Sequence, residues 1–179
     1  VRRWAFDWPE LETYDLSGRV IVLTGATSGI GLAAARLLAR VGATLLLVGR
    51  NGQKTEAVVQ DLRAETGNGR ISPVIADLSD QQAVTQAANT MLARHDQIDA
   101  LLHNAGTLNT RRLTSPDGSE LTVASQVLGP FLLTAKLLPA LMRSPSARVV
   151  TMSSGGMYTV PLRVDSLGMD AASYRGPKQ

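Results

Sequence analysis

The chain has 179 residues, with 18 Lys and Arg against 15 Asp and Glu, and it contains no Cys. The net charge of +3 comes without a block of like charges, so nucleic acid is not an expected partner. Without cysteine, disulfides, thiolate metal sites and a cysteine nucleophile are excluded, and a disulfide-stapled secreted fold is disfavoured. We therefore expect a cytoplasmic protein of ordinary globular composition, with no metal site.

Regular patterning begins at residue 19, and we expect an N-terminal arm over 1–18 and one domain over 19–179. The arm holds both Trp residues but has no clear periodicity. The most apolar stretch, from Val127 to Met142, contains Gly, Lys and two Pro residues and is too short to cross a bilayer. It predicts a buried helix, and we expect no membrane span.

Five short apolar runs alternate with segments of helical periodicity. Strands are expected over 19–24, 43–48, 71–76, 99–103 and 148–152, and helices over 30–41, about 53–65, 79–94 and 120–142. Gly42 suits a left-handed position after the first helix, and Ser79 with Gln82 resembles a capping box before the third. This alternation predicts an α/β fold of the Rossmann type, a doubly wound parallel sheet in a three-layer α/β/α arrangement.

The turn after the first strand, Thr24-Gly-Ala-Thr-Ser-Gly-Ile-Gly31, has the glycine spacing and position of a dinucleotide-binding turn. Gly25 permits the sharp turn, Gly29 lets the backbone approach a pyrophosphate, and Gly31 lets the helix pack closely on the strand. Cofactor contacts are expected from Gly25, Thr27, Ser28, Gly29, Ile30 and Gly31. No Lys-Ser or Lys-Thr pair follows the glycines, which disfavours a Walker A loop.

The second strand ends in Val48-Gly-Arg-Asn51, and this end distinguishes the two nicotinamide cofactors. An acidic side chain there would accept from a ribose 2′-hydroxyl, whereas a 2′-phosphate needs cationic donors. No carboxylate is present, while Arg50, aided by Lys54 and next to Asn51, can clamp a phosphate, so NADP is favoured over NAD. The missing acid also argues against a Rossmann methyltransferase.

Two further motifs follow in order, Asp77-Leu78 after the third strand and Asn104-Ala105-Gly106 after the fourth. With the glycine turn they resemble the short-chain dehydrogenase/reductase family over about 19–154. The resemblance implies an oxidoreductase that moves a hydride between a nicotinamide cofactor and an alcohol or carbonyl substrate. It implies adenine contacts for Asp77 and Leu78, a cofactor cleft shaped by Asn104, Ala105 and Gly106, and a homo-oligomer.

The resemblance also implies a catalytic Ser, and a Tyr with a Lys one helical turn later. Ser154, directly after the fifth strand, is the candidate serine. Tyr174 and Lys178 match the Tyr-x-x-x-Lys spacing, but the Gly and Pro between them disfavour a continuous helix. The segment Ser153-Ser-Gly-Gly-Met157 resembles the subgroup of dehydrogenase/reductase family member 12, which implies a Tyr beyond the last residue and a missing C-terminal part of the fold.

Gln126 stands where the family usually has an Asn that is implied to hold a water in a proton relay. Gln carries the same amide on a side chain longer by one methylene, so the relay would be displaced. This departure leaves open an alternative, a non-catalytic NADP(H)-binding sensor or scaffold with the same fold. The oxidoreductase remains the leading hypothesis.

Overall fold

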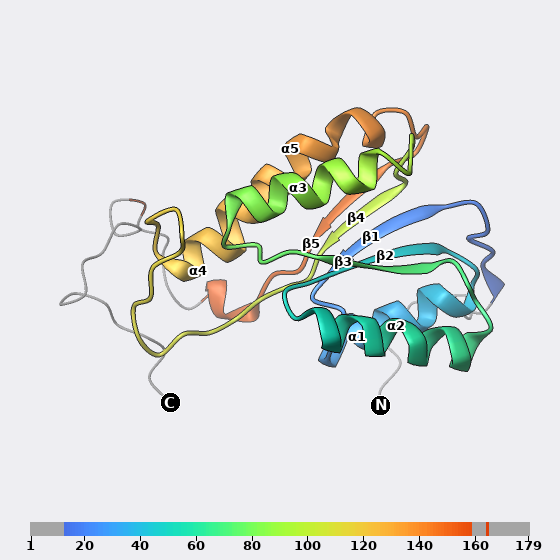
Figure 1. Cartoon of the computed structure of the whole chain (residues 1–179), viewed down its shortest axis with the longest axis horizontal. Helices are drawn as coiled ribbons and strands as arrows, with labels where there is room; N and C mark the ends of the chain where they lie inside the picture. Colours follow the sequence, from blue (N-terminus) through green and yellow to red (C-terminus); the bar gives the residue numbers. More distant parts are fainter. Residues whose placement is uncertain (1–12, 159–163, 165–179) are drawn as a thin grey trace.

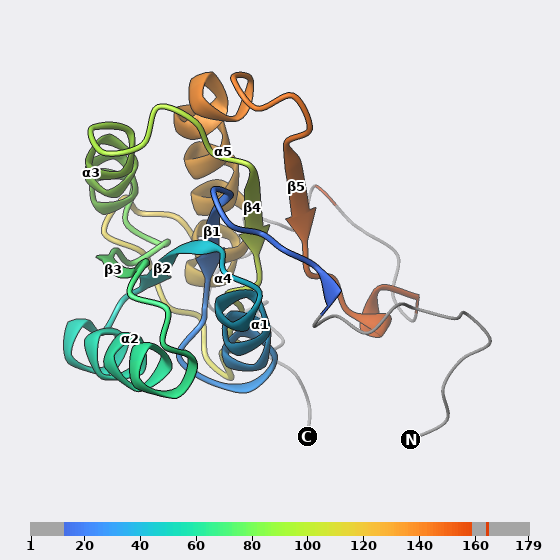
Figure 2. The same cartoon turned by 90° about the vertical axis from the view of Figure 1, so that its right-hand side faces the viewer.

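The computed structural model describes residues 13–158 and residue 164, and its centre is one parallel sheet. The strands are β1 (Val20–Thr24), β2 (Thr44–Gly49), β3 (Ile71–Ile75), β4 (Ala100–His103) and β5 (Arg148–Thr151). Their order is β3-β2-β1-β4-β5 with every pair parallel, and Figure 2 shows β5 beside β4 at one edge. The predicted Rossmann-type sheet is confirmed.

Helices cover both faces of this sheet. They are α1 (Gly29–Arg40), α2 (Gly52–Thr66), α3 (Gln81–Leu92), and a long run that ends in α5 (Gly129–Leu141). Helices α1 and α2 lie on one face and α3 and α5 on the other (Figure 1). Side chains of β1 alternate accordingly, since Ile21 and Leu23 pack with the first pair of helices and Val22 with the second. The three-layer arrangement is therefore confirmed.

The helix expected over 120–142 is interrupted. It consists of α4 (Leu121–Val123), a π-helical turn η2 (Ala124–Leu128) and α5. The prediction that this segment is buried was wrong for one face, because Leu133 and Leu137 are buried whereas Phe131 and Met142 are 74% and 76% exposed. Within the described part, this run alone has the length and composition to cross a membrane, a test that core helices also pass.

The start of α3 differs from the predicted capping box. The N-cap is Asp80, whose carboxylate accepts from the Ala83 amide at 3.0 Å. Ser79 instead donates its hydroxyl to the Asp77 carboxylate at 2.7 Å. The prediction was wrong because the Asp77 carboxylate accepts the hydrogen bond of the Ser79 hydroxyl, while the Asp80 carboxylate caps the helix. After α1, Gly42 has a φ of 84°, the left-handed conformation that was predicted.

Asp99 ties three segments together at the amino edge of the sheet. Its carboxylate accepts from the Val20 amide and from Arg19, both at 2.9 Å, and from the Ser144 hydroxyl at 2.8 Å. Burial alone would raise the pKa of Asp99, but these hydrogen bonds, with one from Gln97, outweigh it and hold the pKa below its ordinary value. The Asp99 side chain thereby joins the starts of β1 and β4 to the turn after α5, at the edge opposite the glycine turn.

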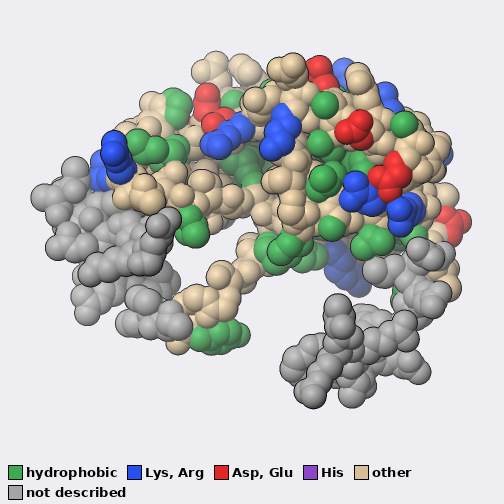
Figure 3. Space-filling model, turned by 90° about the horizontal axis from the view of Figure 1, so that it is seen from below, with side chains coloured by type: hydrophobic (Ala, Val, Ile, Leu, Met, Phe, Trp, Pro, Cys, Tyr) green, Lys and Arg blue, Asp and Glu red, His purple; other side chains and the backbone are tan. Residues whose placement is uncertain are grey.

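The face formed by α1 and α2 carries charges of both signs. Figure 3, seen from this side, shows acidic and basic side chains next to one another. Glu65 of α2 forms ion pairs with Arg36 and Arg40 of α1 at 2.7 and 2.8 Å. Of the expected arm, the structure describes only the part from Thr13 on, where the Leu16 amide donates to the Val41 oxygen at 2.7 Å. The division into arm and domain stays a prediction.

Candidate functional site

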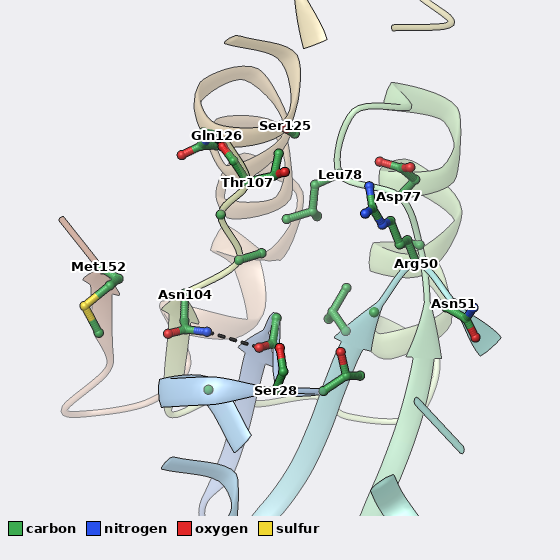
Figure 4. A pocket seen from close by; sticks show the side chains of 18 of the residues that line it. Ser28, Arg50, Asn51, Asp77, Leu78, Asn104, Thr107, Ser125, Gln126 and Met152 are labelled. Atoms are coloured by element: carbon green, nitrogen blue, oxygen red, sulfur yellow. Dashed lines mark hydrogen bonds between the residues drawn. The ribbon is translucent and has the colours of Figure 1, made fainter. Parts of the chain in front are cut away.

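A cavity of about 660 Å³ opens at the carboxyl edge of the sheet (Figure 4). Ligands of open α/β sheets bind at this edge, where the strands end. The lining residues are Gly25, Thr27, Ser28, Ile30, Gly31, Val48, Gly49, Arg50, Asn51, Lys54, Ala76, Asp77, Leu78, Asn104, Ala105, Gly106, Thr107, Ser125, Gln126 and Met152. The structure therefore brings together every predicted cofactor contact except Gly29, which does not line the cavity.

The glycine turn is shaped by close backbone contacts. Gly25 has a φ of 71°, and a Cβ there would lie 2.6 Å from the Cα of Ala105. A Cβ on Gly31 would collide with the Gly25 oxygen and the Asn104 amide. Gly29, by contrast, has no atom within 4 Å of where its Cβ would be, so this position is open to an approaching ligand. The three glycines thus have the geometry that their predicted roles require.

Helix α1 begins at this turn with its first amides uncapped. Its N-cap, Ser28, makes no side-chain hydrogen bond to the helix, and the first turn contains no acidic residue. The first N–H groups of a helix have no partner within it, and the helix dipole adds positive charge there. This set of donors, next to the open Gly29, is chemically suited to a phosphate group.

Thr24 and Asn104 hold the turn against the end of β4. The Thr24 hydroxyl accepts from the backbone amides of Asn104 and Ala105, each at 3.1 Å. In return, the Asn104 side-chain amide donates to the oxygens of Thr24 and Gly25, each at 3.2 Å. Figure 4 shows one of these bonds as a dashed line. The predicted role of Asn104 in shaping the cleft has this physical basis, whereas Thr24 was not predicted as a site residue.

Basic side chains lie at the end of β2. The Arg50 side chain extends toward Asp77, which follows the neighbouring strand β3 (Figure 4), and Lys54, the third residue of α2, also lines the cavity. In the described part of the chain, the ion pairs within 4.0 Å include neither of these cations. Asn51 caps α2, since its side-chain oxygen accepts from the Lys54 amide at 2.8 Å. Two cations are thus available to an anion at this end of the cavity.

The far wall comes from the segment after β3 and from the π-helical turn. Asp77 is held by Ser79, whose amide and hydroxyl donate to one carboxylate oxygen at 2.9 and 2.7 Å. On the π-helical turn, the Gln126 amide donates to the Thr107 oxygen at 2.5 Å. Gln126 therefore ties the helix to the loop after β4, next to Gly106.

None of the predicted catalytic residues is found among the described residues that line the cavity. Ser154 is exposed, its hydroxyl accepts from the Gly156 amide at 3.2 Å, and it does not line the cavity, which reaches the β5 side at Met152. Tyr174 and Lys178 lie outside the described residues. Over the described ranges, no group of three or more His, Asp or Glu side chains could hold a metal.

Several lining residues were not predicted from the sequence. They are Val48, Gly49, Ala76, Thr107, Ser125 and Met152. Gly49, Ala76 and Met152 end or directly follow a strand, so the rule that parallel strands bring their carboxyl ends to one edge could have found them. Ser125 had no such signal, because it enters the cavity through the π-helical turn.

Known proteins are similar to this chain in sequence. Residues 19–163 match the family described as short chain dehydrogenase. Human dehydrogenase/reductase SDR family member 12 is 34% identical over 161 residues, which are 90% of this chain and 50% of that protein, so the resemblance to that subgroup is confirmed. Human retinol dehydrogenase 11 is 37% identical over 142 residues, 79% of this chain and 45% of that protein. The chain spans about half the length of the curated relatives it matches.

Solved structures share the fold. A short chain dehydrogenase from Escherichia coli CFT073 complexed with NADPH has a TM-score of 0.70 at 33% identity, covering 82% of this chain and 62% of that one. A metagenomic short-chain oxidoreductase in complex with NADP has a TM-score of 0.68 at 33% identity, covering 78% of this chain and 62% of that one. With the family match extending over most of the sheet and its helices, the chain belongs to the short-chain dehydrogenase/reductase family of oxidoreductases.

Proposed function

We propose that this chain binds NADP(H), and that the protein transfers a hydride between this cofactor and an alcohol or carbonyl substrate. One observation carries the proposal: the uncapped amides at the start of α1 and the cations Arg50 and Lys54 share a single cavity. Two separated anions, a diphosphate and a 2′-phosphate, match these two positions. NAD, which lacks the second anion, is the weaker alternative.

The described residues fit the parts of the cofactor. The first amides of α1, two of which belong to the lining residues Ile30 and Gly31, would hold the diphosphate. Arg50 and Lys54 would hold the 2′-phosphate, and Asp77 with Leu78 the adenine. When bound, the nicotinamide supplies the hydride carrier. The structures of relatives solved with NADPH and NADP support this choice of cofactor.

Ser154 is proposed to position the substrate oxygen. Its hydroxyl accepts from the Gly156 amide, which leaves the hydroxyl proton to donate to a substrate oxygen. Retinol dehydrogenase 11 is named for an alcohol substrate, and this supports the alcohol or carbonyl class. If the protein binds NADPH but reduces no member of a broad carbonyl panel, the sensor hypothesis replaces this one.

Cofactor binding is testable by thermal shift with NADPH, NADH and S-adenosylmethionine. A ligand that binds only the native state raises the melting temperature, so NADPH should raise it most. Arg50→Ala should reduce the NADPH shift, whereas Arg94→Ala, which removes a cation outside the cavity, should leave it unchanged. Equal shifts for NADPH and NADH would contradict the NADP preference, and a shift with S-adenosylmethionine alone would contradict the function.

Cytoplasmic localisation is likewise proposed, and cell fractionation tests it.

A further inference from the structure

The last residue of β2 has no room for a side chain. Gly49 lines the cavity next to Arg50, and a Cβ on it would collide with the hydroxyl of Thr55 in the first turns of α2. The Cβ and Cγ2 of Thr55 would both lie 3.5 Å away, which is ordinary contact. The Thr55 hydroxyl alone therefore occupies the space where a side chain at residue 49 would begin.

The Thr55 side chain cannot easily move away from Gly49. It is 0% exposed, and its hydroxyl donates to the Asn51 oxygen at 2.8 Å. The Thr55 amide donates to the same oxygen at 2.9 Å, so the residue is fixed to the start of α2 by two bonds. A β-branched side chain in a helix has few alternative rotamers, and those must still fit a closed space. A side chain at residue 49 would thus force the helix start to move.

This position has a chemical meaning in dinucleotide sites. The residue at the end of β2, about 20 positions after the glycine turn, is where a carboxylate accepts from the ribose 2′-hydroxyl of NAD. Gly49 ends β2 and follows Gly29 at that spacing. An Asp or Glu side chain starting there would have to displace the Thr55 hydroxyl.

We propose that Thr55 is a specificity-determining residue for the cofactor, acting through its contact with Gly49. Its hydroxyl keeps a carboxylate out of the end of β2 and leaves Arg50 and Lys54 as the cations available to a 2′-phosphate. The inference rests on the proposed function, since it assumes that a nucleotide binds in this cavity. If it is right, substitutions at both residues 49 and 55 are needed to change the preference from a ribose 2′-phosphate to a ribose 2′-hydroxyl.

The test compares wild type with Gly49→Asp, Thr55→Ala and the double variant. Thr55→Ala keeps the Cβ, which is at ordinary contact distance, and removes the colliding hydroxyl. Thr66→Ala is the matched control, because the Thr66 hydroxyl donates to the Leu62 oxygen four residues back in the same helix, at 2.7 Å, away from Gly49. Melting temperature reports the collision, and calorimetric titration with 2′,5′-ADP and 5′-AMP reports the preference at the ribose.

Gly49→Asp alone should lower the melting temperature by about 5 °C, as overpacking of a closed site does. Adding Thr55→Ala should restore it, whereas adding Thr66→Ala should not. The double variant should shift the ratio of affinities for 2′,5′-ADP and 5′-AMP by about tenfold toward 5′-AMP, the effect of exchanging one charged hydrogen-bond partner.

Two results would overturn the inference while leaving the proposed function standing. One is a Gly49→Asp variant as stable as wild type that alone changes the preference as far as the double variant. The other is a double variant that keeps the wild-type preference for 2′,5′-ADP. If wild type binds neither nucleotide, the proposed function fails, and the specificity role of Thr55 fails with it.

Discussion

The side-chain amide of Asn104 donates to the main-chain oxygen of Thr24 at 3.2 Å, across 80 positions of sequence. With the reciprocal bonds from the backbone to the Thr24 hydroxyl, it fixes the glycine turn of β1 against the loop after β4. The geometry of the cofactor cavity therefore depends on a contact between two strand ends as well as on the glycines themselves.

Asn104→Ala should weaken both stability and cofactor binding. It leaves the oxygens of Thr24 and Gly25 without this donor, and we expect a loss of about 1–3 kcal/mol in the free energy of unfolding. NADPH affinity should fall as well, because the turn loses its support. Urea denaturation and calorimetric titration measure the two effects. Asn89→Ala, on the exposed side of α3, should change neither quantity; equal behaviour of the two variants would contradict the role of Asn104.

Gly31→Ala should be destabilising although alanine favours helices. The new Cβ would collide with the Gly25 oxygen and lie 3.0 Å from the Gly25 carbonyl carbon, and such overpacking costs about 1–3 kcal/mol. Gly69→Ala is the control, since nothing lies within 4 Å of its Cβ position and its φ is not positive. It should be neutral or slightly stabilising. Thermal unfolding distinguishes the two, and a harmless Gly31→Ala would refute the close packing of α1 on the turn.

Asp99→Ala should separate stability from binding. The substitution removes the acceptor of the Val20 amide, Arg19 and Ser144, so the free energy of unfolding should fall by about 1–3 kcal/mol or more. Because Asp99 lies at the amino edge, opposite the cavity, the Kd for NADPH of the folded variant should stay unchanged. A large change in Kd, measured well below the melting temperature, would show that the two edges are coupled.

Stability should decrease in mild acid through His103. Its Nε2 lies 2.8 Å from the Thr134 hydroxyl, which itself donates to the Pro130 oxygen, so Nε2 carries the proton of a neutral ring. The other nitrogen, Nδ1, is buried with no partner among the described residues. Burial therefore lowers the pKa of His103 from its ordinary value of 6.5.

The unfolded chain then binds a proton at a higher pH than the folded one. The contribution of neutral His103 to the free energy of unfolding should be fully present above the ordinary pKa of the unfolded histidine. It should be lost as the pH drops from about 7 to about 5. Urea denaturation at several pH values in this range gives the free energy of unfolding as a function of pH. The slope of this dependence should be smaller for His103→Asn than for wild type. The pKa of His95 is also lowered, by burial and then by Arg94, so His95→Gln shows how much of the slope belongs to the second histidine. An unchanged slope in His103→Asn would refute the assignment.

The exposed side of the helical run formed by η2 and α5, up to the C-cap Met142, is expected to hold a second copy of the chain, as the family resemblance implies. Val127, Phe131, Leu138 and Met142 are 54%, 74%, 49% and 76% exposed and recur at helical spacing. Light scattering should show a concentration-dependent mass above 19.0 kDa that Phe131→Lys lowers. Leu108→Lys, at an 80% exposed loop position, should leave the mass unchanged. A wild-type monomer at all concentrations would contradict this expectation.

The strands could be predicted from sequence to within one residue at each end. Most are short apolar runs buried between two helical layers, and that pattern is specific when glycine turns flank it. The edge strand β5 has the same composition, yet Val149 and Val150 are 49% and 50% exposed. Composition therefore identified the strand but not its surroundings.

Other features depend on contacts that no local pattern records. Apolar spacing predicted the long helix, but a π-helical turn within it changes which side chains face the cavity and brings Ser125 there. Ser79 had the spacing of a helix cap, yet the neighbouring carboxylate of Asp80 took that place. The collision between a side chain at residue 49 and Thr55 is a matter of distance across a strand and a helix, which spacing alone does not give.

The proposed function requires a dinucleotide phosphate to sit on the backbone amides at the start of α1. Nuclear magnetic resonance on the 19.0 kDa chain can follow each amide during titration with NADPH. The largest shifts are expected at Gly29, Ile30 and Gly31, with none at the far end of α3 near Leu92. Saturating NADPH that leaves the amides of 29–31 unmoved while shifting others would contradict it.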